Sequence, residues 1–204
     1  MSNLTAFYLC NLLICGSIIS TATVAKADEL PFDDSFYLLT ICTSFMTHED
    51  NEYCDDGYIL KSETLKDGNV IETVLMEGMG AYAWNHTGID KIDANTYHVY
   101  FGCGSPCGAN MLFGRGDKEQ HFGLYFNFDA KSRCTVEYNQ DKNLWIARQF
   151  FTDKKITLPS TYGISESSFM PKYNVEFDKK GNLVVTDFMG SNDTRHLPNP
   201  CTAH

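Results

Sequence analysis

Short runs in which hydrophobic and polar residues alternate cover most of the chain and are separated by turn-forming residues. Alternation with a period of two, bounded by turns, predicts β-strands. Nine strands are expected, at 58–65, 70–76, 96–101, 109–113, 121–128, 134–138, 144–151, 173–177 and 183–188. Asp67-Gly68 between the first two runs is a strong hairpin turn, and regular turn signals of this kind favour antiparallel sheets.

One segment follows a different period. Leu38, Ile41, Cys42 and Phe45 recur at helical spacing directly after the N-cap candidates in 33–35, which predicts a helix over 36–47. An acidic loop is expected at 48–57. The predicted fold class is therefore mainly β: an antiparallel sandwich or barrel-like sheet with one N-terminal helix, stapled by disulfides.

The first 27 residues are almost entirely apolar and end in an A-x-A site at 25–27, which indicates a cleaved secretory signal. An uncleaved anchor is disfavoured by polar residues such as Asn11 and Ser17, and a lipid attachment at Cys15 by the bulky Ile14 before it. The prediction is one disulfide-bonded domain, residues 28–204, that is periplasmic or secreted and is not inserted in a membrane after cleavage.

Six cysteines follow the predicted signal, an even number that suits an oxidising compartment. Cys54 in the acidic loop can fold back onto Cys42, and Cys103 and Cys107 lie close enough to pair. By elimination, Cys134 pairs with Cys201. Zinc is the rival explanation, with His98 and His121 as further ligands, but no second closely spaced cysteine pair supports it, so no metal is expected.

The chain is acidic, with 26 Asp and Glu against 16 Lys and Arg and a formal net charge of −10. Such a surface repels nucleic acids and anionic membranes, and it attracts basic proteins or cations. The simpler interpretation is that the charge keeps an exported protein soluble. Arg115-Gly116-Asp117 is expected to be an ordinary turn.

The most distinctive local motif is the loop Gly104-Ser105-Pro106 between Cys103 and Cys107, flanked by further glycines. A disulfide there would make it rigid, and rigid loops lose little entropy when they dock. Over five residues it resembles the inhibitory loop of the Ivy-type periplasmic lysozyme inhibitors, without the His that such a loop presents. A stapled hairpin tip with no partner is the alternative.

Tyr82 and Trp84 lie between predicted strands and are candidates for a protein or sugar contact, with core filling as the alternative. The sequence predicts no catalytic residue and no cofactor. The first hypothesis is an inhibitor or immunity-type protein that binds a basic cell-envelope hydrolase. Two alternatives are a secreted hydrolase acting on glycans, which needs a carboxylate pair in a cleft, and an envelope structural or adhesion module.

Overall fold

The computed structural model describes residues 35–49, 51–78, 86–104, 107–159, 171–187 and 194–202, which form four antiparallel sheets of consecutive strands. The first sheet contains β1 (Phe36–His48), β2 (Asn51–Thr64) and β3 (Val70–Glu77). The second contains β4 (Thr87–Asp93), β5 (Thr96–Gly104), β6 (Cys107–Gly114) and β7 (Lys118–Phe122). The third contains β8 (Phe126–Asp129), β9 (Cys134–Asn139), β10 (Leu144–Gln149) and β11 (Lys155–Thr157). The fourth contains β12 (Tyr173–Phe177), β13 (Leu183–Asp187) and β14 (Thr194–Leu197).

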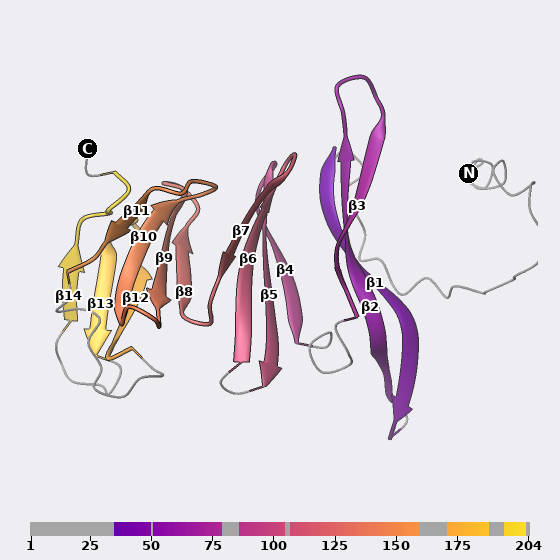
Figure 1. The fold of residues 1–204 in the computed structure, drawn as a ribbon, viewed down its shortest axis with the longest axis horizontal. Coiled ribbons are helices and arrows are strands. Elements are labelled where there is room, and N and C mark those ends of the chain that lie inside the picture. Colours follow the sequence, from indigo (N-terminus) through magenta and orange to yellow (C-terminus); the bar gives the residue numbers. More distant parts are fainter. Residues whose placement is uncertain are drawn as a thin grey trace, which may run out of the picture.

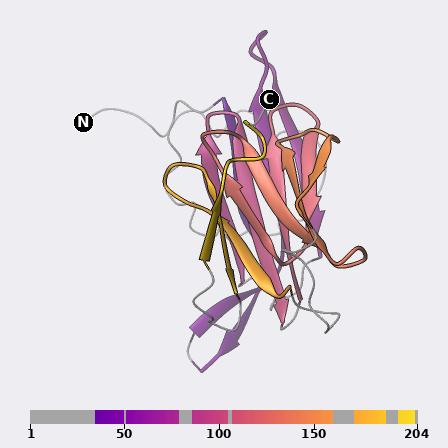
Figure 2. The same cartoon turned by 90° about the vertical axis from the view of Figure 1, so that its left-hand side faces the viewer.

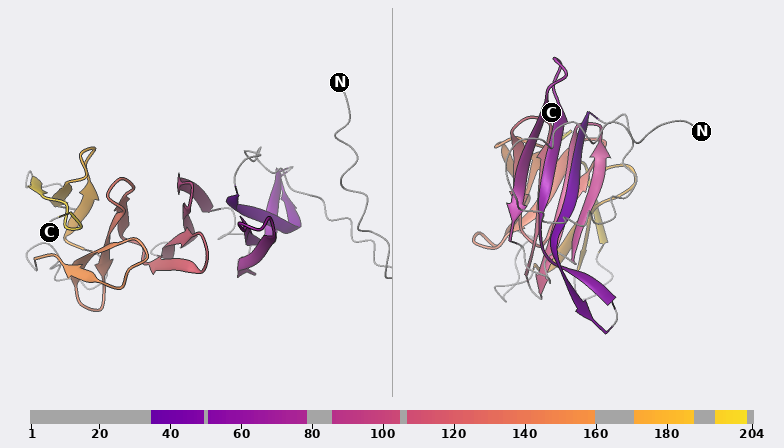
Figure 3. Two further views of the ribbon diagram at one scale, coloured as in Figure 1. Left: turned by 90° about the horizontal axis from the view of Figure 1, so that it is seen from above. Right: turned by 90° about the vertical axis from the view of Figure 1, so that its right-hand side faces the viewer.

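The four sheets are stacked in the order of the chain (Figure 1). Seen from above, they follow one another along the long axis of the molecule (Figure 3). Each pair of neighbouring sheets shares a hydrophobic core, so the described residues form three cores. The first core is centred on Phe36, Ile59 and Val99, the second on Leu112 and Phe122.

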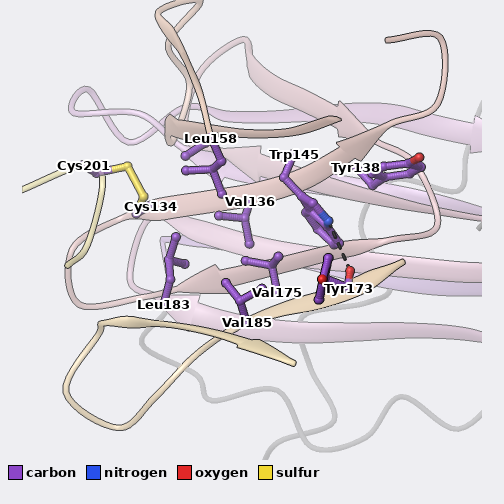
Figure 4. Packing of buried hydrophobic residues seen from close by; sticks show 11 residues of the cluster. Cys134, Val136, Tyr138, Trp145, Leu158, Tyr173, Val175, Leu183, Val185 and Cys201 are labelled. Atoms are coloured by element: carbon purple, nitrogen blue, oxygen red, sulfur yellow. Dashed lines mark hydrogen bonds between the residues drawn. A yellow bond between two sulfur atoms is a disulfide. The ribbon is translucent and has the colours of Figure 1, made fainter. Parts of the chain in front are cut away.

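The third core lies between the third and fourth sheets and is the largest (Figure 4). Trp145 is 1% exposed there, and its indole N–H donates to the carbonyl of Tyr173 at 3.2 Å. Val136 and Val185 fill the space beside it from the two facing sheets. A disulfide between Cys134 and Cys201 closes one end of this core.

The second core contains a buried ion pair as well as aromatic side chains. Arg148 of β10 lies 3.0 Å from the carboxylate of Glu137 on β9, and both side chains are almost completely buried. The Arg148 guanidinium also donates to the carbonyl of His121 at 2.9 Å and lies over the ring of Phe122. Burial raises the pKa of Glu137 and lowers the pKa of Arg148, while each charge partly offsets this effect on the other.

The predicted helix over 36–47 is wrong, because these residues form β1. The strand begins with four apolar residues in a row: Phe36 and Leu38 are buried in the first core, while Tyr37, which also packs against this core, and Leu39 are half-buried. A strand of this kind reads as a continuous hydrophobic run, in which apolar residues also occur at helical spacing by coincidence. The described residues contain strands and turns only.

The other predicted strands are present, with two differences. The run 121–128 is two strands, β7 and β8, which belong to different sheets and are separated at 123–125. β4, β11 and β14 were not predicted from the sequence. The hairpin turn at Asp67-Gly68 is confirmed, with Gly68 at a φ of 85°.

Two predicted disulfides are confirmed, Cys42–Cys54 and Cys134–Cys201, each with a Cα–Cα distance of 5.8 Å. They are compatible with an oxidising compartment. The predicted signal, residues 1–27, lies outside the described residues, as do the side chains of Cys103 and Cys107.

Candidate interaction hairpin

The end of the β1–β2 hairpin extends beyond the rest of its sheet. β3 pairs with β2 only as far as Tyr58, so the part beyond Gly57 is a ribbon of two strands. We call the described residues 42–49 and 51–57 the stapled hairpin. It projects from one end of the molecule (Figures 1 and 3).

The Cys42–Cys54 disulfide fixes the base of the stapled hairpin. The register between β1 and β2 is irregular on both sides of Ser44, and the disulfide spans this irregularity. An isolated two-stranded ribbon is marginally stable in water, so the covalent link keeps the projecting strands paired. At the far end, Glu49 adopts a left-handed φ of 49°, and the side-chain amide of Asn51 donates to its carbonyl at 3.2 Å.

Three large apolar side chains are exposed on this ribbon. Met46 and Tyr53 are directly opposite each other across the two strands and are each 40% exposed. Phe45 precedes Met46 and therefore lies on the other face, where it is 39% exposed. Both faces of the projecting ribbon thus offer apolar contact area.

Carboxylates lie close in sequence to these apolar side chains. Four exposed acidic residues lie within the stapled hairpin: Glu49, Glu52, Asp55 and Asp56. Asp55 accepts a hydrogen bond from the hydroxyl of Ser44 at 3.4 Å, and Asp56 accepts one from the amide of Gly57 at 2.8 Å. The predicted acidic loop is therefore two paired strands and a tight turn. Exposed apolar side chains together with carboxylates are the composition of a protein-binding surface for a cationic partner.

The predicted loop at Gly104 is the turn of the β5–β6 hairpin, whose ladder continues to the pair Gly104 and Cys107. The ends of β5 and β6 that meet there lie toward the same end of the molecule as the stapled hairpin (Figures 1 and 2). Ser105 and Pro106 lie outside the described residues, and so do Tyr82 and Trp84.

A hollow of about 310 Å³ is lined by residues at or beside the β4–β5, β6–β7 and β8–β9 turns and by Phe151 after β10. These three turns lie at the end of the molecule opposite the stapled hairpin (Figure 1). The lining of the hollow consists of three cations, an amide and an aromatic ring: Arg115, Lys118, Arg133, Asn95 and Phe151. Four of these residues lie in turns and Lys118 begins β7, and they are far apart in the sequence, which is why no sequence motif indicated the hollow. Among the residues that the structure describes, none of those lining the hollow is a carboxylate.

Among the described residues, no group of three or more His, Cys, Asp or Glu side chains is arranged to hold a metal ion. This part of the chain also contains no helix long and apolar enough to span a membrane.

No protein-family model, curated protein or solved structure matches this chain.

Proposed function

We propose that the protein is an exported binding protein that uses the stapled hairpin to block a basic cell-envelope hydrolase. The observation that carries the proposal is a narrow, disulfide-fixed ribbon that exposes Phe45, Met46 and Tyr53 together with four carboxylates. A ribbon of two strands is thin enough to enter a substrate cleft. Its fixed backbone loses little conformational entropy on binding.

The two kinds of side chain have separate roles in this proposal. Tyr53 and Phe45 supply the buried contact area that dominates interface energies. The carboxylates steer a basic partner toward the hairpin and raise the association rate, an effect that salt screens. Within the first five residues of β2, Glu52 and Asp55 flank Tyr53, so steering and contact are directed to the same place.

The proposal is tested with purified, oxidised protein against a panel of basic hydrolases that degrade envelope glycans. We expect inhibition of at least one enzyme, with an association rate about tenfold lower at high than at low salt. The variant Phe45→Ser/Tyr53→Ser is expected to bind at least ~30-fold more weakly, the loss typical of a truncated hot spot.

The matched control is Val70→Ser/Ile71→Ser, which removes two apolar side chains from β3 that are more exposed than Phe45 and Tyr53 and lie outside the stapled hairpin. It should leave inhibition unchanged. If both double variants inhibit as well as the parent protein, the hairpin is not the contact. If no basic hydrolase in the panel is bound at low salt, the proposed partner class is wrong.

The β5–β6 turn is a second element that faces the same end of the molecule, and a third variant separates its role from that of the stapled hairpin. Replacing Gly104 and Ser105 with bulky charged residues abolishes binding if this turn also enters the partner. If affinity is unchanged, the stapled hairpin is the principal contact.

A further inference from the structure

We infer that the hollow at the opposite end binds a phosphate or sulfate group. The molecule as a whole is strongly acidic, yet every charged residue that lines this hollow is a cation. Oxyanions are recognised by arginine forks and lysine amines held in fixed positions.

Arg115 is held in place by contacts with three other parts of the chain. Its guanidinium donates to the side chains of Asn95 at 3.0 Å and Ser35 at 2.6 Å, and to the carbonyl of Thr64 at 3.2 Å. These bonds use three of the five N–H donors of a guanidinium. The turn that carries Arg115 is fixed as well, because Glu63 accepts a hydrogen bond from the amide of Gly116 at 2.8 Å.

Arg133 is positioned by a different set of contacts. It pairs with Asp93, donates to the hydroxyl of Thr96 at 3.2 Å, and lies over the ring of Phe150. These bonds use two of its five donors. Glu63 and Asp93 each pair with one of these arginines and offset much of its charge, so Lys118 carries the unpaired positive charge of the hollow.

Lys118 and Asn95 add donors that are not used for structure. Lys118 is exposed and forms no ion pair with the part of the chain that the structure describes. Phe151, whose ring lies against Gly114, gives the hollow one apolar wall. A volume of about 310 Å³ is at the small end of ligand sites, which suits an oxyanion or its ester with a small sugar.

The test is a titration of the intact protein, in phosphate-free buffer at low ionic strength, followed by NMR. Inorganic phosphate, inorganic sulfate, glucose 6-phosphate and glucose 6-sulfate are the four probes. We expect saturable shifts of the Arg115 and Arg133 side-chain N–H signals with at least one probe. An ester that binds more tightly than the free ion identifies an esterified ligand, whereas equal affinity identifies the free ion.

Two variants make the test specific. Lys118→Gln should weaken binding about tenfold, because it removes a charge that has no structural contact. Lys142→Gln removes an exposed charge from the β9–β10 turn, outside the lining, and should leave affinity unchanged. Equal losses in both variants would indicate non-specific screening and overturn the inference. Shifts that do not saturate with any probe would overturn it as well.

Discussion

At the scale of single residues, the strongest constraint is the ion pair between Glu137 and Arg148 in the second core. Leaving one buried charge without its partner strongly lowers the stability of the folded protein, whereas removing both charges lowers it much less. We expect Arg148→Ala to lower the free energy of unfolding by about 3–5 kcal/mol. The double variant Glu137→Leu/Arg148→Met should lower the free energy of unfolding much less. Both decreases are measured by urea unfolding, followed by the fluorescence of Trp145.

The ion pair between Glu137 and Arg148 also makes the loss of stability in Arg148→Ala dependent on pH. Burial already raises the pKa of Glu137 above its ordinary value of 4.5, and Arg148 limits the rise. Without Arg148 the pKa rises further, so the folded state holds the proton more tightly than the unfolded state does. The loss of stability caused by Arg148→Ala is therefore smallest below pH 4.5 and grows as the pH rises through the raised pKa of Glu137. A loss that is constant from pH 4 to 8 would contradict this explanation.

At the scale of elements, the stapled hairpin should depend on its own disulfide. Replacing Cys42 and Cys54 with serine opens a loop of sequence separation 12, which the chain-entropy model values at about 3 kcal/mol. We expect amide hydrogen exchange to accelerate in the stapled hairpin while the third core remains protected.

The matched control removes the other disulfide. Cys134→Ser/Cys201→Ser should lower the stability of the third core, because that bridge joins β9 to the segment after β14. It should leave exchange in the stapled hairpin unchanged at temperatures where the protein stays folded. If exchange accelerates equally in both regions with either variant, the sheets unfold as one cooperative unit.

Elements also differ in how far the sequence determines them. Where one face of a strand is polar, as in β12, or where a turn requires special chemistry, as at Gly68 and Gly181, the prediction is correct. β1 was missed because it begins with four apolar residues in a row. The split between β7 and β8 was missed because alternation continues through Gly123, and alternation does not reveal which sheet a strand joins.

The candidate sites also combine features that the sequence predicts with features that depend on the tertiary structure. The pairing of Cys42 with Cys54 came from the sequence, but the exposure of Phe45 and Tyr53 did not, because it depends on where β3 ends. The cationic hollow was not predictable in principle from local patterns. Its residues are brought together by the stacking of sheets, which is a property of the tertiary structure.

At the scale of the whole molecule, the net charge of −10 opposes folding through repulsion between like charges. Raising NaCl from about 10 mM to about 0.5 M shortens the screening length from ~30 Å to under ~8 Å. We therefore expect the melting temperature to rise by a few degrees over this range, as measured by circular dichroism. A fall would mean that ion pairs such as Arg115 with Glu63 outweigh the general repulsion.

Because the layers follow the order of the chain, their assembly can keep pace with synthesis. Cys42 and Cys54 both lie in the first hairpin and can form their disulfide as soon as it has folded. The thiol of Cys134 can pair only after Cys201, 67 residues later, has been synthesised. A chain that has not yet placed its last strands carries an unpaired thiol on β9, open to exchange with other thiols. Formation of the Cys134–Cys201 disulfide therefore coincides with packing of the fourth sheet on the third.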